Sequence, residues 1–509
     1  MKNNRMLINI IAQIISFSVN IGISFFLTSF IIEHIGKNIF GFWGLANNFI
    51  SYITVFTIAI NSMVSRFISI HFHQDKIDSA NKYFSTVAIS NIVVSLTLTF
   101  PTLFLIFYLD KIINIPKNFI FDVKLLWLFL FFNFFINLIG SIYDVGTFVR
   151  NRLDLSAWIS INSNLIRGLS LLILFYFFAP NLWYVGLSFL FCTFYLVIAK
   201  FRIMKKLTPE IKINRKNFNW NYLKELVVIG SWNSINQLNQ VFINGLNLLI
   251  TNLFIGTTQM SLLSVAITIP MQIQNFVQII ASTFTPNLTA IYANGHLTQF
   301  IREVITSMKI TTFIGSVPIV GLVVFGNDFF ALWLPTLSVD EINIIQILSI
   351  LTLLPMLINT IVNPLFNVNT ITAKVKIPVI TNCIIGILNI ILVYIFIKYT
   401  DLGVYAVAGV SAILSLARML FFVPIYSSII LKVKCFSFYK VILRGIFSLI
   451  ILTFLFNIVN GALYIESWMS LIVICILSAI FGYILNFLII FNKEEKSKIY
   501  NFLKRKFNT

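Results

Sequence analysis

Residues 230–252 read GSWNSINQLNQVFINGLNLLITN, and this stretch decides what kind of fold the chain can have. The run is long enough to cross a bilayer, which takes about 20 apolar residues, yet it is crowded with amides. The amides recur three or four residues apart, so on a helix they share one face; they are Asn233, Asn236, Gln237, Gln240, Asn244 and Asn247. An unpaired amide in hydrocarbon costs on the order of 2–7 kcal/mol. That face must therefore look into a wet cavity or a packed helix bundle.

The composition is that of an integral membrane protein. The chain has 509 residues, of which 58% are hydrophobic and 10% charged, with a mean hydropathy of +0.93. A soluble domain carries about 25% charged residues, and the deficit here extends along the whole chain. The first apolar run, 7–32, exceeds the roughly 7–15 residues of a signal-peptide core and lacks a small-residue cleavage site before Glu33. We expect it to be a retained first helix.

Several classes of chemistry are excluded by the motifs that the sequence lacks. The four cysteines are scattered, and the HFH at 71–73 has no further metal ligand nearby, so we expect no metal and no cofactor. No P-loop and no nucleophile motif appears, which argues against an enzyme and against ATP hydrolysis within this chain. The net charge of +19 is distributed over alternate loops rather than a basic domain, which argues against nucleic acid.

Apolar run lengths predict an all-α integral membrane protein with about fourteen transmembrane helices. The predicted connections are short, and the longest, 201–226, separates the sixth span from the seventh. The predicted spans are 7–32, 41–66, 83–109, 125–149, 157–179, 182–201, 226–255, 260–285, 308–326, 342–366, 377–398, 402–430, 441–461 and 467–491.

Basic residues predict the orientation of these spans. With the N-terminus in the cytoplasm, 29 of the 36 Lys and Arg residues fall in cytoplasmic segments. Five fall outside and two lie within spans. One miscounted helix would invert every later loop, so this asymmetry favours two cytoplasmic termini.

An internal repeat predicts two lobes. A shift of 220 positions aligns the polar stripe of the first span with that of the seventh, and Gly36 with Gly256. Six spans separate the copies, so both run the same way through the membrane. We therefore expect two six-helix lobes plus two extra C-terminal helices. The expected parts are the N-lobe at 1–205, a cytoplasmic linker at 206–225, the C-lobe at 226–435, and the last two spans with a basic tail at 436–509.

Charged residues inside spans are candidates for the functional site. Arg167 and Arg418 each lie about ten residues, or about 15 Å, from the cytoplasmic end of a span. Guanidinium binds phosphate bidentately, which favours an anion site; the alternatives are snorkelling or a structural pair, for instance with Asp144. Arg66 ends the predicted span 41–66 and Arg150 follows the span 125–149, and both are expected either to line the cavity mouth or to anchor the helices. Asp144 is a candidate for ion coupling or for an ion pair with an arginine.

The chain resembles the bacterial polysaccharide flippases, which translocate O-antigen, capsule and related lipid-linked oligosaccharides. They share a superfamily with multidrug exporters and lipid II flippases. The resemblance covers essentially the whole chain and rests on loose patterns rather than on a catalytic fingerprint. The patterns are GFWGLANNF at 41–49, SRFISIHFHQDKIDSANKYFSTV at 65–87, VRNRLDLSAWISINSNLIRG at 149–168, LLITNLFIGTTQMSLLSVA at 248–266 and NDFFALWLP at 327–335.

The resemblance implies alternating access, with a polyprenyl-pyrophosphate-linked glycan as cargo, in a monomer of the bacterial cytoplasmic membrane that works beside glycan-assembly proteins. Arg167, Arg418, Arg66 and Arg150 would bind the pyrophosphate. The glycan would contact Gln13, Asn20, Asn233, Asn236, Gln237, Gln240 and Asn244.

Three other functions stay open. A multidrug exporter usually places an acid in its first or seventh span, where this chain has amides and hydroxyls. A lipid II flippase shows several arginines in its first helices, where this chain has none after Arg5. A membrane-embedded glycan polymerase or glycosyltransferase needs a larger outward loop than any predicted here.

Overall fold

The computed structural model describes the chain in two compact units, Met1–Ser261 and Leu262–Thr509. Every regular element among the described residues is a helix. The described backbone comprises residues 2–497 without 151, 242–244, 283, 286, 287, 289, 290, 293, 294, 373 and 375, and the described side chains also exclude 2–7, 10, 14, 37–39, 232, 236, 239, 240 and 282.

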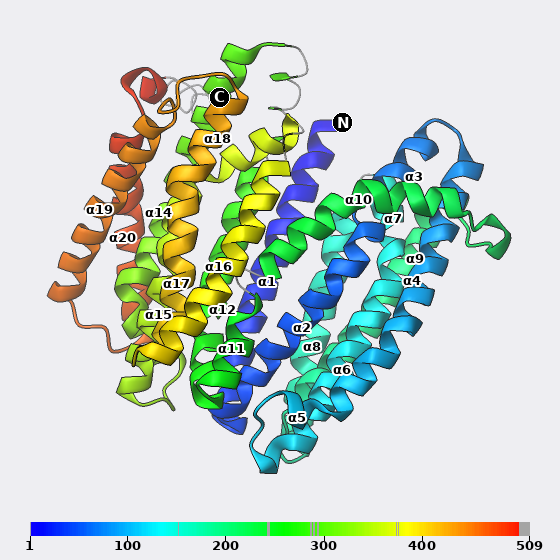
Figure 1. Cartoon of the computed structure of the whole chain (residues 1–509), viewed down its shortest axis with the longest axis horizontal. Helices are drawn as coiled ribbons and strands as arrows, with labels where there is room; N and C mark the ends of the chain where they lie inside the picture. The colour runs from blue at the N-terminus through cyan, green and yellow to red at the C-terminus, as the bar shows by residue number, and fades with distance from the viewer. Residues whose placement is uncertain are drawn as a thin grey trace. The chain divides into compact units, whose positions relative to one another are not determined.

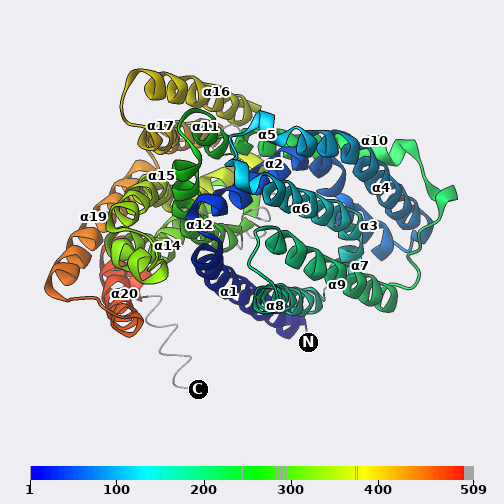
Figure 2. The ribbon, with the colours of Figure 1, turned by 90° about the horizontal axis from the view of Figure 1, so that it is seen from below.

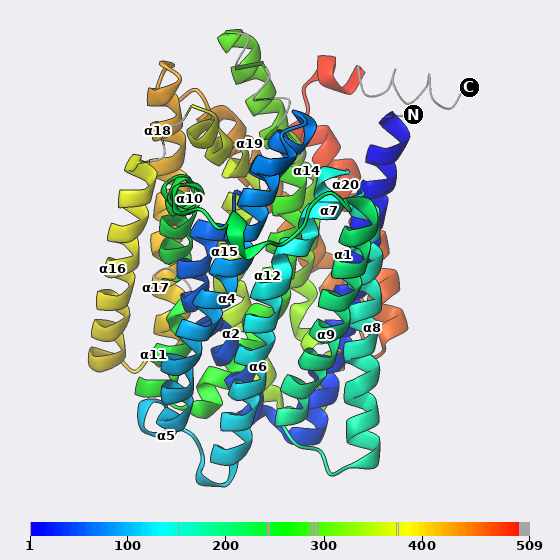
Figure 3. The same cartoon turned by 90° about the vertical axis from the view of Figure 1, so that its right-hand side faces the viewer.

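The first unit is built from long helices that pack side by side (Figure 1). α6 packs on α9, α8 packs on both α1 and α9, and α10 packs on α2. Figure 3 shows α10 nearly end-on while α4, α6 and α9 run lengthwise, so α10 crosses their direction. The elements are α1 (Lys2–Ile35), α2 (Lys37–Asn61), α3 (Val64–His73), α4 (Ile77–Phe107), α5 (Leu109–Ile112), η1 (Lys117–Phe119), α6 (Ile120–Gly140), η2 (Ser141–Asp144), α7 (Val145–Val149), α8 (Leu153–Phe177), α9 (Trp183–Leu207), η3 (Arg215–Asn217), α10 (Trp220–Gln240) and α11 (Asn247–Phe254).

The second unit is organised around α14, which packs on α15, α19 and α20. α16 packs on α17, as Figure 2 shows. The elements are α12 (Thr257–Ser282), which begins at the end of the first unit, α14 (Leu297–Trp333), α15 (Val339–Ile371), α16 (Lys376–Tyr399), α17 (Val404–Ala417), the π-helical η5 (Arg418–Phe422), α18 (Val423–Ile430), α19 (Tyr439–Ala462) and α20 (Trp468–Ile490).

The structure confirms an all-helical membrane architecture, with one difference at the predicted seventh span. Thirteen helices among the described residues are long and apolar enough to cross a membrane, and none of them covers 226–255. Instead, α10 ends at Gln240 and the eight-residue α11 begins at Asn247. The dense amides lower the hydropathy of this stretch. Val241 and Gly245 are π-helical, and residues 242–244 lie outside the described residues.

Side chains of α2 contact the backbone between α10 and α11. The carbonyl oxygen of Gly245 accepts hydrogen bonds from Asn48 Nδ2 at 2.9 Å and from the Tyr52 hydroxyl at 2.5 Å. These bonds tie α2 to the segment just before α11. Elsewhere along the contact between α10 and α2, a Cβ on Gly230 would lie 2.0 Å from the Ala59 carbonyl oxygen. Only glycine allows the two helices to come this close.

The last two helices are an integral part of the second unit rather than a loose addition. Asn486 of α20 donates to Ser316 Oγ of α14 at 2.6 Å and accepts from Ser448 of α19. These three polar residues are almost fully buried. At one end of the helices, Lys309 Nζ contacts Glu495 Oε1 at 2.7 Å. A buried polar network whose members are paired fixes one arrangement of the helices.

Two glycines at equivalent positions of the predicted repeat share an unusual backbone conformation. Gly36 precedes α2 with φ +94° and Gly256 precedes α12 with φ +138°, so two positions 220 residues apart adopt a backbone that side chains rarely tolerate. The first compact unit includes α10 and α11, which were expected to open the C-lobe at 226–435. The lobe boundary drawn from the repeat stays a prediction.

Candidate functional site

Arg167 is buried in the first unit without a carboxylate partner. Its side chain on α8 is 8% exposed, and among the described residues no acid forms an ion pair with it. Nη2 donates to Ser24 Oγ of α1 at 3.1 Å, and the guanidinium carbon lies 4.9 Å from the centre of the Phe189 ring. Such a cation–π contact contributes about 0.5–2 kcal/mol, less than the several kcal/mol that burying a charge costs. The site therefore holds an uncompensated positive charge.

Arg418 is the corresponding charge of the second unit. Nη1 donates to Asn382 Oδ1 at 2.7 Å, and the guanidinium carbon lies 5.5 Å from the Phe366 ring centre. Arg418 begins η5, a π-helical segment between α17 and α18. Short π-helical segments inside α-helices are frequent at functional sites. The Nε groups of both arginines are buried and have no hydrogen-bond partner in the described part of the chain, so each guanidinium retains a free donor there.

Asp144 pairs with a lysine and not with an arginine, contrary to the expected pair. Its Oδ2 lies 2.7 Å from Nζ of Lys200 on α9. Asp144 ends the 3-10 segment η2, where the long α6 is interrupted. The salt bridge gives Asp144 a structural partner on α9. A role of Asp144 in ion coupling stays a prediction.

The arginines at the helix ends differ in what they contact. Arg150 donates from Nε to the Leu207 carbonyl at 3.0 Å, contacts Glu210 at 3.5 Å, and stacks on Phe72 at 4.8 Å. These contacts join α7 to the end of α9, which is the anchoring arrangement. Arg66 on α3 is exposed and has no such partner in the described part of the chain.

The predicted glycan-binding residues fall into three groups. Gln13 is exposed and donates to the Leu153 carbonyl at 3.4 Å, so it joins α1 to α8. Asn20, Asn233 and Gln237 are half-buried and carry no hydrogen bond within the described structure. The side chains of Asn236 and Gln240, and all of Asn244, lie outside the described residues.

The structure adds residues around Arg167 that sequence reasoning missed. Ser24 of α1 binds Arg167, and Asn20 lies one turn before Ser24 on the same face of α1. Trp43 lies beside the same arginine, and Asn382 binds Arg418. Trp43 stands in GFWGLANNF and Ser24 in the repeated stripe, but neither pattern indicates a neighbour on another helix.

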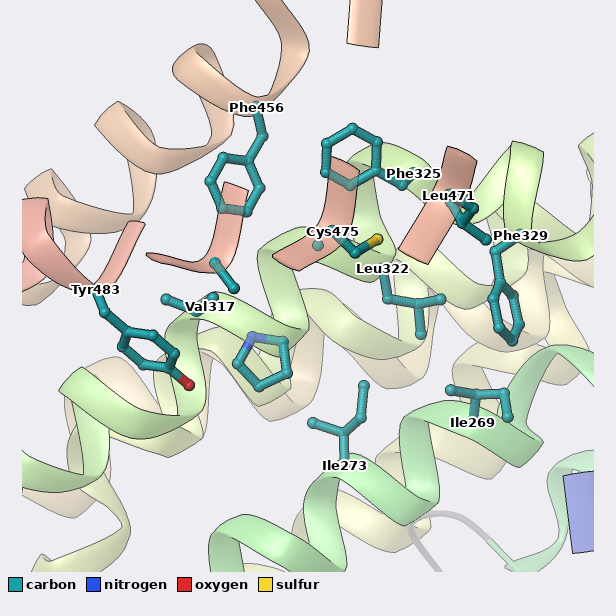
Figure 4. Close-up of a pocket in the computed structure, with 13 residues that line it drawn as sticks. Ile269, Ile273, Val317, Leu322, Phe325, Phe329, Phe456, Leu471, Cys475 and Tyr483 are labelled. Carbon is teal, nitrogen blue, oxygen red and sulfur yellow. The ribbon is translucent and has the colours of Figure 1, made fainter. Parts of the chain in front are cut away.

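An apolar cavity of about 340 Å³ lies within the second unit (Figure 4). Figure 4 shows Phe325 and Leu322 of α14 facing it together with Cys475 of α20. Ile269 and Ile273 of α12 close another side, and Phe456 of α19 contributes an aromatic ring. The lining suits a hydrocarbon ligand, because it offers large apolar surfaces and few polar groups.

Comparisons with known proteins agree with this architecture. No protein-family model matches the chain. The uncharacterized membrane protein EpsK of Bacillus subtilis strain 168 is 27% identical over 493 residues, which cover 97% of each chain. The solved lipid II flippase MurJ, in an inward closed conformation, has a TM-score of 0.64 at 15% identity and covers 95% of this chain and 97% of its own.

Transporters of the MOP superfamily are also similar in structure. An inward-facing multidrug resistance MATE transporter has a TM-score of 0.63 at 14% identity and covers 82% of this chain and 95% of its own. A MOP superfamily transporter from Pyrococcus furiosus has a TM-score of 0.62 at 15% identity, with 83% and 95% covered. These neighbours are transporters and flippases rather than enzymes. The chain is thus a multi-pass membrane protein with the fold of MOP superfamily transporters such as the MATE and MurJ proteins.

Proposed function

We propose that this protein moves a polyprenyl-pyrophosphate-linked oligosaccharide across the membrane by alternating access, for the synthesis of a surface polysaccharide. The observation that carries the proposal is the pair of arginines within spanning helices, Arg167 and Arg418, neither of which has a carboxylate partner among the described residues. A cation without a partner at that depth is costly, and such groups mark substrate pathways. Pyrophosphate is a ligand that guanidinium groups bind with several strong hydrogen bonds.

The remaining parts of such a substrate also find matching chemistry. Asn20, Asn233 and Gln237 have amides free to bind sugar hydroxyls, and Asn236, Gln240 and Asn244 continue the stripe in sequence. The cavity at Phe325 and Phe456 offers an apolar surface for the polyprenyl chain. Arg66 belongs to the proposed pyrophosphate path because it is exposed and has no ion-pair partner among the described residues. Arg150 is a weaker candidate for this path, because it already forms an ion pair with Glu210.

Coverage favours a flippase over a multidrug exporter. The MATE neighbour covers 82% of this chain and the lipid II flippase covers 95%. The additional length fits a protein that retains helices beyond a twelve-helix core. Asp144 already forms an ion pair with Lys200, so its carboxylate is less suited to bind an exchanged cation. Lipid II is the second candidate substrate, because the solved flippase with nearly full coverage is named for it.

The proposed setting is the bacterial cytoplasmic membrane, with both termini in the cytoplasm, where the excess of basic residues belongs. The protein would act as a monomer beside glycan-assembly proteins. Its ligands would be the glycan lipid and membrane lipids, with no nucleic acid and no cofactor.

Reconstituted transport tests the proposal. Proteoliposomes carrying either a polyprenyl-pyrophosphate oligosaccharide or lipid II are assayed for movement of the labelled glycan to the opposite leaflet. We expect transport of the oligosaccharide, its loss in Arg418→Ala, and its retention in the matched control Arg444→Ala, whose guanidinium binds Asn492 at an exposed helix end. Full transport by folded Arg418→Ala contradicts the assignment of the site, and transport of lipid II alone favours the second substrate.

A further inference from the structure

Residues 208–219, which join α9 to α10, are held against α4 at the right-hand edge of Figure 1. Ser85 Oγ of α4 accepts a hydrogen bond from the backbone N–H of Asn214 at 3.0 Å, and Thr86 Oγ1 accepts one from that of Asn219 at 3.1 Å. Both hydroxyl-bearing residues are fully buried. The backbone of this segment is therefore fixed on the first unit, so its side chains project from a defined surface.

The contact with α4 lies near the depth of lipid headgroups. α4 has 31 residues and is about 46 Å long, whereas the hydrocarbon core of a bilayer is about 30 Å thick. The charged residues of α4, Asp78 and Lys82, both lie in its first two turns, so the excess length belongs at this end. Ser85 is about 12 Å from the start of the helix. The segment bound there is thus at the boundary between hydrocarbon and headgroups.

The segment and the start of α10 present cations without acidic partners. The exposed basic side chains are Lys212, Arg215, Lys216 and Lys224. The acids nearby are engaged elsewhere, because Glu210 contacts Arg150 at 3.5 Å and Glu225 accepts from the Tyr83 hydroxyl at 2.6 Å. None of the four cations forms an ion pair with a described residue. Their charge is therefore available to an anion outside the protein.

α10 adds an exposed apolar face directly after these cations. The exposed residues recur at i, i+4, i+7 and i+8 and so share one side of the helix; they are Trp220, Lys224, Val227 and Val228. Trp220 is 67% exposed and Val228 is 60% exposed, whereas Leu226 and Gly230 are buried on another side. α10 crosses the direction of α4 (Figure 3), so it can lie along the membrane surface. Tryptophan is enriched at that interface.

We propose that residues 212–228 form a binding surface for an anionic phospholipid. The lipid phosphate contacts the cations at Arg215 and Lys216, and the acyl chains lie along Trp220 and Val228. Charge complementarity selects this occupant, because the surface combines cations without acidic partners with an adjoining apolar face, as an anionic lipid requires. The inference specifies one class of membrane lipid, and it holds whether or not the protein transports a glycan.

Lipid binding to the purified full-length protein tests the surface in the absence of any glycan lipid. Native mass spectrometry follows titrations with phosphatidylglycerol and with phosphatidylcholine. We expect the wild type to bind phosphatidylglycerol about tenfold more tightly or better. The triple variant Lys212→Gln, Arg215→Gln, Lys216→Gln should lose most of this preference. Val228→Asn should weaken the binding of both lipids.

The matched control removes the same charge from three dispersed positions. Each control residue is exposed and has an acid beside it in the sequence; they are Lys76 next to Asp75, Arg302 next to Glu303, and Lys493 next to Glu494. The triple variant Lys76→Gln, Arg302→Gln, Lys493→Gln should keep the wild-type preference for phosphatidylglycerol, because it leaves the proposed surface intact.

Equal phosphatidylglycerol preference in the two triple variants overturns the proposal. If the first does not fold, Arg215→Gln is compared with Lys76→Gln, and equal preference again overturns it. Displacement of phosphatidylglycerol by an equal concentration of polyprenyl pyrophosphate would mean that the surface binds the substrate lipid instead. Transport is assayed separately in phosphatidylcholine proteoliposomes, so a failure of this inference and a failure of the proposed function are distinguishable.

Discussion

The backbone N–H of Gly41 donates a hydrogen bond to Ser261 Oγ at 3.3 Å, and the two residues are 220 positions apart in the chain. That separation equals the shift of the internal repeat. Gly41 follows the positive-φ Gly36 by as many residues as Ser261 follows the positive-φ Gly256. Equivalent positions of the two copies are thus in direct contact, and the contact depends on glycine at the first of them.

Replacing Gly41 with alanine should destabilise the protein. A Cβ at this position would lie 2.5 Å from Ser261 Oγ and 2.9 Å from Ser261 Cα, and the second atom is backbone that cannot rotate away. Overpacking of this kind costs about 1–3 kcal/mol. The thermal unfolding midpoint in detergent should fall accordingly.

Gly409→Ala on α17 is the control for Gly41→Ala, because no atom lies within 4 Å of its Cβ position. It should leave stability unchanged or raise it by up to about 1 kcal/mol, since alanine favours a helix. An unfolding midpoint for Gly41→Ala equal to that of Gly409→Ala would show that the close contact is absent.

Replacing Asn382 with aspartate should inactivate transport without unfolding the protein. Asn382 Oδ1 accepts from Arg418 Nη1 at 2.7 Å, so a carboxylate there would form an ion pair that occupies the guanidinium. Asn382→Ala removes one hydrogen bond to a charged group, worth about 1.5–3 kcal/mol, and should reduce transport less completely. Transport by reconstituted protein is the measurement, and full activity of Asn382→Asp would separate Arg418 from the substrate path.

The sequence predicts the architecture well because run length and composition are local properties. Apolar stretches of about 20 residues determine the spans, and the structure confirms an all-helical membrane protein. The contact at Gly245 is different, because its hydrogen-bond donors Asn48 and Tyr52 come from another helix. Nothing within residues 230–252 indicates which distant side chains would bind this carbonyl.

The sequence predicts individual residues of the candidate site, but it does not predict which residues contact one another there. The depth of Arg167 in its span identifies a charge that needs an explanation. Its neighbours Ser24 and Trp43 come from other helices, so only the packing places them beside it. The prediction that Asp144 pairs with an arginine was wrong. Its partner Lys200 is 56 residues away and lies at the predicted end of a span, so its spacing from Asp144 in the sequence does not indicate the contact.

The pair of Lys309 and Glu495 should make stability depend on pH. Burial raises the pKa of Glu495, but hydrogen bonds from Lys309 and the Asn492 backbone outweigh it, so the pKa lies below its ordinary value of 4.5. A carboxylate with a lowered pKa contributes stability above its unfolded-state pKa and loses it as the pH falls through the folded-state value.

Glu495→Gln should therefore lower the unfolding midpoint at about pH 7, and the difference from wild type should shrink as the pH falls below 4.5, the ordinary pKa of a glutamate. Glu494→Gln, a neighbouring exposed carboxylate, should change little at any pH. A deficit in Glu495→Gln that stays constant over this range would mean that the ion pair is not its cause.

A double-mutant cycle can measure how the two hydrogen bonds from α2 to the Gly245 carbonyl depend on each other. Tyr52→Phe removes one of the two hydrogen bonds without changing shape, and Asn48→Ala removes the other. Each single change leaves one bond in place and should cost about 0.5–1.5 kcal/mol. The double variant removes both side-chain partners of this partly buried carbonyl, so its loss should exceed the sum of the two by about 0.5 kcal/mol or more. Asn47→Ala, whose amide donates to the Trp43 carbonyl within α2, is the control and should combine additively with Tyr52→Phe. Additive losses in Tyr52→Phe with Asn48→Ala would mean that the Gly245 carbonyl does not depend on these two side chains of α2.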